Sequence, residues 1–427
     1  MSFPEGFLWG ASTAAHQVEG GNVNNDSWLL EHAPGTHYAE PSGDACDHYH
    51  RYAEDIALLA GLGLGAYRCS LEWSRIEPAE GEFSRAALDH YRRMLMACHE
   101  RGLTPMLTFH HFTSPLWVAA GGGWEEPRTA ELFARFCERA MRHLGDLVPY
   151  ACTLNEPNLG ALLHQVMGIP SPHGGPGWAA AAAALQTTPE RLSVFQHASG
   201  PQATGTFRSA HRLAVDAIKG VRAETQVGMT VALSAWEAAA GGEGELARLR
   251  GLSEDVFLEG AEGDFLGVQN YSGIAVGPMG PIEPGPEAER TQMGYAYRPD
   301  ALEHAIRRAA GVTGLPVFVT ENGIGTADDA RRIDFIDAAL RGVASCLGDG
   351  VDVRGYFYWS LFDNFEWGLG YRPTFGLVAV DRETQVRTVK PSARHLGAIA
   401  RANALSWGSA LSPRGARRRP PCARCAG

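Results

Sequence analysis

Lysine is almost missing from this sequence: Lys219 and Lys390 are the only two, and arginine supplies the remaining basic residues. Acidic residues outnumber basic ones by 48 to 37, which gives a net charge of −11. Proteins that bind nucleic acid present a basic face to the phosphates, so this balance disfavours a nucleic-acid partner. It also argues against binding to anionic membrane surfaces. We attribute the shortage of lysine to compositional bias.

Long apolar runs are also missing. No stretch approaches the roughly 18 apolar residues of a membrane span, and the alanine-rich run at 179–184 is far too short. The first seven residues contain no basic region followed by an apolar segment, so we expect no signal peptide. The eight cysteines are scattered, and Cys69, Cys152 and Cys346 fall in apolar runs typical of buried thiols. Reduced thiols predict a cytoplasmic protein.

The apolar residues that are present form eight short runs that alternate with helical patterns over the 427 residues. We expect strands at 7–11, 66–71, 105–109, 151–156, 227–233, 264–271, 317–321 and 353–360. We expect helices at 52–62, 88–101, 131–144, 209–224, 301–310, 330–347 and 392–403. Nearly continuous apolar strands are typical of parallel sheets that are buried on both faces.

This alternation favours the α/β class and a single-domain (β/α)8 TIM barrel over residues 1–411. A doubly wound open sheet is the alternative, but such sheets usually carry a glycine-rich phosphate loop after the first strand, and none is present here. Residues 168–205 are rich in Pro, Gly, Ala and Ser and are interpreted as an unusual βα-loop insertion at the barrel mouth.

The last sixteen residues, 412–427, differ from the rest by their content of Arg and Pro. A lone Cys422-x-x-Cys425 pair is weak evidence for zinc, because a structural zinc site needs a second pair of ligands. We therefore predict a disordered tail.

Two of the expected strands end in a carboxylate. The run Val317–Thr320 stops at Glu321, Asn322 and Gly323, and Gly323 allows the chain to turn away at once. The earlier run stops at Asn155, Glu156 and Pro157, because proline cannot donate to a strand ladder. In a parallel barrel both carboxylates lie at the same mouth. Glycoside hydrolysis requires two carboxyl groups, one on each side of the anomeric carbon.

Other residues near strand ends also fit sugar chemistry. Sugar hydroxyls call for polar side chains that bond through two atoms, and four candidates are Gln17, His111, Asn155 and Glu366. Sugar rings call for flat apolar surfaces, and Trp359 and Trp367 flank the end of the eighth strand. Arg68 and Tyr271 also end strands, where they could keep a carboxylate ionised.

With these motifs in order, the chain resembles family 1 glycoside hydrolases, the β-glucosidase/β-galactosidase family. Thr153-Leu154-Asn155-Glu156-Pro157 resembles its acid/base motif, and Val319-Thr320-Glu321-Asn322-Gly323 resembles its nucleophile motif. The resemblance runs from about residue 7 to residue 403. The other matching segments are Gln17-Val18-Glu19-Gly20, Tyr67-Arg68-Cys69-Ser70, Trp73-Ser74-Arg75-Ile76, Tyr358 to Trp367 and Phe375-Gly376-Leu377-Val378.

The resemblance implies a retaining β-glycosidase, most simply a β-glucosidase with added β-galactosidase or β-fucosidase activity, acting on a small β-glycoside or oligosaccharide. Glu156 would be the acid/base and Glu321 the nucleophile, with Arg68 and Tyr271 supporting Glu321. The implied substrate-binding residues are Gln17, His111, Asn155, Tyr271, Trp359, Glu366, Trp367 and Phe375, with Asn155 on the sugar 2-hydroxyl. A retaining mechanism places the carboxyl groups roughly 5–5.5 Å apart and requires no cofactor and no metal.

Three departures from the family pattern bear on substrate preference. Phe112 stands where the family usually has Trp, Gln269 stands where it usually has Asn, and the 168–205 segment matches nothing. The branch that acts on 6-phosphorylated sugars carries Ser and Lys after the eighth strand. Glu366 and Trp367 stand there instead, which implies an unphosphorylated sugar.

Three other interpretations stay open. The first is a barrel that binds sugar without catalysis, although it would not require both Glu156 and Glu321. The second is transglycosylation, which depends on how well the leaving-group loops exclude water. The third is a metallohydrolase built on histidines, namely His48, His50, His110 and His111. It is disfavoured because the first strand does not end in His-x-His.

Overall fold

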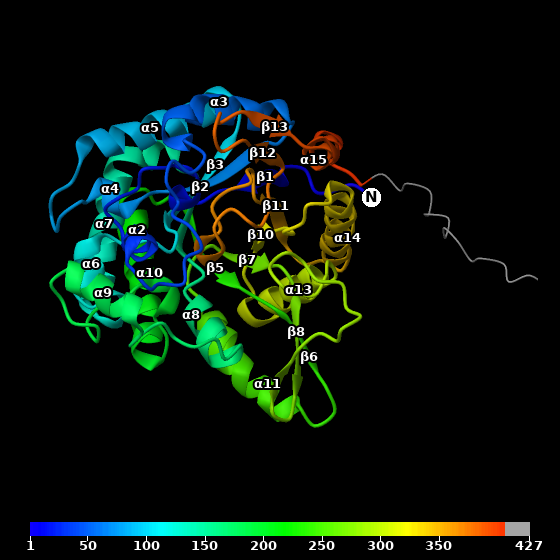
Figure 1. Ribbon diagram of the computed structural model, residues 1–427. Helices are drawn as coiled ribbons and strands as arrows, with labels where there is room; N and C mark the ends of the chain where they lie inside the picture. The colour runs from blue at the N-terminus through cyan, green and yellow to red at the C-terminus, as the bar shows by residue number, and fades with distance from the viewer. Residues whose placement is uncertain (406–427) are drawn as a thin grey trace, which may run out of the picture.

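The computed structural model describes residues 1–405, so the predicted tail at 412–427, with Cys422 and Cys425, lies outside the described residues. Eight parallel strands close into a barrel in the order β1-β11-β10-β7-β5-β4-β3-β2 (Figure 1). This confirms the predicted TIM barrel. The strands are β1 (Leu8–Ser12), β2 (Ala66–Ser70), β3 (Thr104–His110), β4 (Tyr150–Asn155), β5 (Gln226–Ala232), β7 (Phe265–Asn270), β10 (Val317–Asn322) and β11 (Val353–Trp359).

Helices surround the barrel and shield the outer face of its strands (Figure 1). The longer ones are α3 (His48–Gly61), α5 (Arg85–Glu100), α7 (Arg128–Leu144), α10 (Pro201–Val221), α13 (Ala301–Thr313), α14 (Asp329–Gly348) and α15 (Pro391–Ala402). The helix predicted at 209–224 was placed wrongly. It begins at Pro201, because proline is well suited to the first position of a helix, and it ends at Val221.

The segment predicted as an insertion at 168–205 contains a helix of its own, α9 (Pro176–Ala184), and the beginning of α10. Trp178 and Ala181 of α9 pack against Leu30 of α2 (Asp26–His32) and Ala119 of α6 (Leu116–Ala120). An apolar cluster therefore holds α9 against helices α2 and α6, which follow β1 and β3.

The sequence patterns missed a small second sheet, formed by β6 (Ala235–Ala238), β8 (Gly273–Gly277) and β9 (Gly280–Ile282). This sheet and α11 (Glu243–Arg250) project from one end of the molecule at the bottom of Figure 1. A further pair of short strands, β12 (Val378–Val380) and β13 (Arg387–Val389), follows β11. No helix within residues 1–405 has the length and apolar character that crossing a membrane requires.

Two layers fill the inside of the barrel. The lower layer is an apolar cluster with one residue from each of six strands: Ala66, Met106, Cys152, Phe265, Phe318 and Phe357. Side chains alternate between the two faces of a strand, so residues an even number of positions further along face the same interior. Arg68 and Gln269 follow Ala66 and Phe265 in this way. The apolar layer therefore forms a floor beneath a polar layer at the carboxyl ends of the strands.

The two strands that carry the candidate carboxylates depart from this alternation. The pairing register shifts between Val319 and Glu321 in β10, and between Cys152 and Asn155 in β4. Strict alternation from Phe318 would point Thr320 inward and Glu321 outward. The irregularity brings Glu321 to the interior, where it meets Arg68, and re-aiming a side chain is a common role of such bulges.

Candidate active site

Glu321 is held by two donors. Arg68 Nη1 donates to Glu321 Oε1 at 2.5 Å, and the Tyr271 hydroxyl donates to Glu321 Oε2 at 2.6 Å. The side chain of Arg68 is fully buried, and only 3% of Glu321 is exposed. A buried carboxylate and guanidinium are stable together only when their remaining positions are also bonded, and Tyr271 provides such a bond. Both oxygens of Glu321 are thus fixed in direction.

Gly323, just beyond β10, is required by close packing. A Cβ atom at this position would lie 1.9 Å from the carbonyl oxygen of Trp359. We predicted that Gly323 allows a turn. The glycine also allows the segment after Glu321 to pass directly beside the end of β11.

Glu156 lies just beyond β4 and has a different environment. Its backbone adopts a left-handed conformation, with φ at +47°, and its N–H donates to the carbonyl of Thr230. Gln269 Nε2 donates to Glu156 Oε1 at 2.8 Å. Non-glycine residues in this conformation are concentrated at functional sites, where the surrounding structure maintains the strain.

Both carboxyl groups have raised pKa values, but to different degrees. Burial raises the pKa of Glu156 well above its ordinary range, and the negative charge of Glu321 raises it further. Burial also raises the pKa of Glu321, but Arg68 and Tyr271 oppose the rise because they favour the ionised form. Glu321 therefore loses its proton first, and Glu156 keeps its proton at a pH where Glu321 is ionised.

The orientation of the Asn155 amide follows from its neighbours. Its Oδ1 atom accepts hydrogen bonds from Arg68 Nη2 and from the Thr230 hydroxyl. The Nδ2 group is buried and has no partner within residues 1–405. The amide is thus fixed with its N–H donors free to bond a hydroxyl oxygen beside Glu321.

The Gln17 amide is also fixed, but here the N–H donors are bonded and the oxygen is left as an acceptor. Its Nε2 group donates to the carbonyl of Phe365 at 2.6 Å and to Glu366 Oε2 at 3.3 Å. Its Oε1 atom is buried and has no partner among the described residues, so it offers an acceptor. Burial and the charge of Glu321 raise the pKa of Glu366 to about 8.

His111 offers a further polar atom. Burial lowers the pKa of His111 well below its ordinary range, and Arg68 lowers it further, so the imidazole is neutral. Its Nδ1 atom is buried without a partner in the described part of the chain. The ring lies almost parallel to Trp359, with 5.7 Å between the ring centroids.

The predicted aromatic residues gather around this polar layer. Trp359 is buried against Ala14 and Phe375, and the ring of Phe375 packs edge-on against Tyr271. Trp367 stacks on His16 and meets the ring of Phe112, which keeps an aromatic contact at the position where Trp was expected. Trp359 is therefore part of the packing as well as the site boundary.

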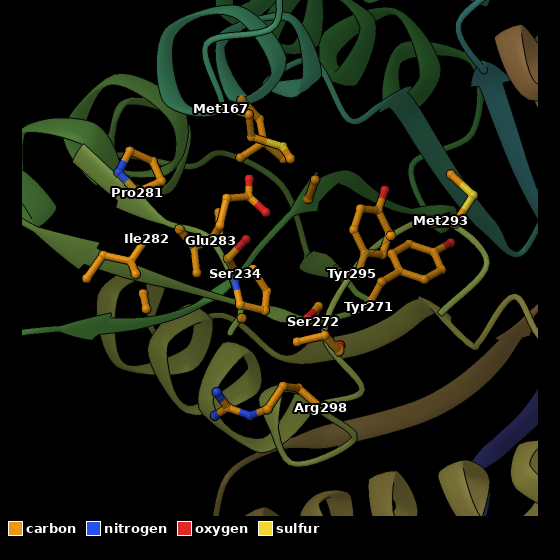
Figure 2. A pocket seen from close by; sticks show the side chains of 18 of the residues that line it. Met167, Ser234, Tyr271, Ser272, Pro281, Ile282, Glu283, Met293, Tyr295 and Arg298 are labelled. Carbon is orange, nitrogen blue, oxygen red and sulfur yellow. Dashed lines mark hydrogen bonds between the residues drawn. The ribbon is translucent and has the colours of Figure 1, made fainter. Parts of the chain in front are cut away.

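A cavity of about 640 Å³ opens beside the carboxylates, and Gln269 and Tyr271 line its inner end. Figure 2 shows Tyr271, Tyr295 and Met293 toward one end of this cavity and Pro281 and Ile282 toward the other. Its walls are formed by residues 159–167, the end of β5, the small sheet and the loop at 283–296. None of its lining residues comes from 168–205.

The structure brings every predicted site residue, His111 included, to this mouth. The other three histidines of the metallohydrolase interpretation bond to separate partners. His48 pairs with Asp55, His50 pairs with Asp47, and His110 bonds to Ser114. Sequence reasoning missed the bond from Gln269 to Glu156. The sequence did hold a clue to this bond, since Gln269 lies in β7 two residues before Tyr271, which directly follows that strand. Thr230, in the middle of an apolar run, gave no signal.

Comparisons with known proteins agree with this geometry. A model of glycosyl hydrolase family 1 matches residues 1–255 and 269–405. The thermostable beta-glucosidase B of Thermobispora bispora is 33% identical, over 96% of this chain and 92% of its own length. A bifunctional beta-D-glucosidase/beta-D-fucosidase of Bifidobacterium breve is 32% identical, over 92% of this chain and 96% of its own. The crystal structure of beta-glycosidase BGL167 is 53% identical, with a TM-score of 0.91 over 96% of this chain and all of its own.

Proposed function

The chain belongs to glycosyl hydrolase family 1, a family of retaining O-glycosyl hydrolases, and we propose that Glu321 is its nucleophile and Glu156 its acid/base. The observation that carries this assignment is the unequal environment of the two carboxyl groups. Arg68 and Tyr271 both donate to Glu321, whereas Glu156 receives one amide donor and faces the charge of Glu321. Pairs of titratable groups with pKa values pushed apart in this way are typical of acid and base assignments.

In the first step an ionised Glu321 oxygen attacks the anomeric carbon. The bond from this carbon to the leaving oxygen breaks, and Glu156 gives its proton to that oxygen. The product is a glycosyl ester on Glu321 and a free alcohol. Asn155 Nδ2, fixed by Arg68 and Thr230, donates to the 2-hydroxyl oxygen, a contact that strengthens in the transition state.

The second step follows from the loss of a charge. Once Glu321 is an ester, its negative charge no longer raises the pKa of Glu156, so that pKa falls and Glu156 becomes a base. Glu156 takes a proton from water, the water oxygen bonds to the anomeric carbon, and the ester bond breaks. The sugar leaves with its original configuration, and Glu321 is again a carboxylate.

We propose that the sugar is a non-reducing β-D-glucosyl residue, with a β-D-fucosyl or β-D-galactosyl residue as a second choice. The relatives named β-glucosidase and β-glucosidase/β-fucosidase support this preference. Gln17 Oε1, Glu366 and His111 Nδ1 would bond the remaining hydroxyls, and Trp359 and Trp367 would lie against the ring. We place the two carboxyl groups roughly 5–5.5 Å apart, as the retaining mechanism requires.

We also propose a cytoplasmic location. The six cysteines of the described residues are free thiols buried in the fold, which suits a reducing compartment. Fractionation of cells that produce the untagged protein tests this proposal, and recovery of the activity outside the cytoplasm would reject it.

The experiment that tests the assignment uses a panel of nitrophenyl β-glycosides and the variant Glu321→Gly with and without azide. We expect the wild type to release nitrophenol, the variant to be inactive, and azide to restore release with an α-glycosyl azide as product. Asp26→Asn is the matched control, since Asp26 is also a buried carboxyl with a raised pKa but lies in α2. A β-glycosyl azide, or an inactive control, would reject the assignment of Glu321.

A further inference from the structure

The cavity beside the carboxylates is apolar over most of its wall. Its apolar side chains come from the segment after β4, from the small sheet and from the loop after that sheet. They include Leu159, Leu162, Leu163, Met167, Ile274, Ile282 and Met293. At about 640 Å³ the cavity is in the size range of pockets that hold drug-sized ligands. Gln269 and Tyr271 line the cavity and also bond the two carboxyl groups, so a group placed here lies next to the polar layer.

Four of the polar side chains that line the cavity already have protein partners, and Ser234, Glu283 and Tyr295 line it as well. Arg298 donates to Asp300 and Glu237, and the Ser272 hydroxyl donates to the carbonyl of Ala296. Gln269 and Tyr271 donate to the two carboxyl groups. A second sugar in this cavity would bring several hydroxyls that lose water, and each hydroxyl that faces the apolar part of the wall instead of a polar partner is costly.

The rim of the cavity carries several exposed apolar side chains. Met167 is 45% exposed and Ile282 is 48% exposed, and both also line the cavity. Ile169, which is 44% exposed, donates its backbone N–H to the carbonyl of the lining residue Leu163. Figure 2 shows the side chains of Met167 and Ile282 on different sides of the opening. An apolar group longer than the cavity would therefore stay in contact with apolar surface as it leaves.

We propose that the preferred substrates are β-glycosides of long apolar alcohols, such as alkyl or isoprenoid chains, rather than oligosaccharides. This inference rests on the proposed function, because it places the sugar at Glu156 and Glu321 and the apolar chain in the cavity. Continuity supports the placement, since Gln269 and Tyr271 contact the carboxyl groups and line the cavity as well. Binding energy from the chain that persists in the transition state raises kcat/KM.

The first experiment measures kcat/KM for methyl, butyl, hexyl and octyl β-D-glucosides, each below the concentration at which it forms micelles, and for cellobiose. We expect kcat/KM to rise about twofold to fourfold for each added methylene, and octyl glucoside to exceed cellobiose by at least about a hundredfold. A flat series, or cellobiose as the better substrate, overturns the inference.

The second experiment tests the rim with the double variant Met167→Ser/Ile282→Ser. The matched control is Met96→Ser/Val386→Ser, because Met96 is 42% exposed and Val386 is 55% exposed, and neither lines the cavity. We expect the rim variant to lose about tenfold on octyl glucoside and less than twofold on methyl glucoside. The control should keep both values. Equal losses on both substrates in the rim variant would overturn the inference.

The two proposals fail in different ways. If the wild type hydrolyses no glycoside at all, the proposed function fails before the chain-length series can be read. If it hydrolyses phenyl and methyl glucosides but gains nothing from chain length, only the cavity inference fails. Melting temperatures of the wild type and the two double variants, measured alongside, separate a loss of folding from a loss of binding.

Discussion

The barrel mouth has a sugar side, around Asn155 and Glu321, and a cavity side, and the polar side chains of the two sides differ in their hydrogen bonding. On the sugar side, buried polar atoms have no partner within residues 1–405, and they include Gln17 Oε1, His111 Nδ1 and Asn155 Nδ2. On the cavity side, Arg298 and Ser272 already donate to other groups of the protein, and most of the lining surface is apolar. Gln269 and Tyr271 stand on the boundary between the two sides.

This difference teaches where specificity comes from. Buried polar atoms without partners are costly unless a ligand bonds them, so the sugar side selects hydroxyls at defined positions. An apolar wall selects by area and is tolerant of shape. We therefore expect kcat/KM to depend sharply on which hydroxyls the sugar carries. We expect it to rise gradually with the apolar area of the leaving group.

The largest effect on this comparison is expected from Asn155→Ala. We expect a loss of about a hundredfold or more in kcat/KM, because a donor that strengthens in the transition state is removed. The loss should be the same for methyl and octyl glucosides, since Asn155 is on the sugar side. Steady-state kinetics with 2-deoxyglucosides give the control, because the variant should lose little on a substrate that lacks the bonded hydroxyl. A loss that depends on the length of the alkyl chain would contradict the separation of the sugar side from the cavity side.

An intermediate effect is expected at the boundary, from Tyr271→Phe. The hydroxyl of Tyr271 donates to the ionised form of Glu321, so its removal raises the pKa of Glu321. Glu321 must be ionised to attack, and the acid limb of the pH profile of kcat/KM should therefore move to higher pH. Tyr295→Phe, in the same cavity wall, should leave that limb in place. An unchanged acid limb in Tyr271→Phe would contradict the contact.

The smallest effect is expected from Leu163→Ala on the cavity side. The change removes apolar surface from the wall without touching a hydrogen bond, so kcat/KM for octyl glucoside should fall by about threefold to tenfold. Methyl glucoside does not reach this wall and should be hydrolysed as before. A larger loss on methyl glucoside than on octyl glucoside would show that Leu163 supports the carboxylates instead.

The sugar side was largely predictable from sequence. Strand runs that end in Asn155-Glu156 and Thr320-Glu321-Asn322 identify the residues, and the barrel topology places both pairs at one mouth. The direction of the side chains was not predictable. It depends on register shifts in β4 and β10, and these arise from pairing between strands that are far apart in the chain.

The cavity side could not be predicted. Its walls come from segments with weak periodicity, such as β8, β9 and the loop at 283–296, and they meet only in the folded chain. The segment at 168–205 has the most unusual composition and was predicted to be an insertion at the barrel mouth, but none of its residues lines the cavity. Instead, Trp178 and Ala181 of this segment pack against α2 and α6.

The most direct test of the central claim is to trap the glycosyl-enzyme. Wild-type protein is incubated with 2-deoxy-2-fluoro-β-D-glucosyl fluoride, and intact mass and peptide mapping then locate the label. The account predicts one fluoroglucosyl group per chain, attached to Glu321, with loss of activity in proportion to labelling. A label on Glu156 or Glu366, or full hydrolytic activity of protein that never carries a label, would contradict it.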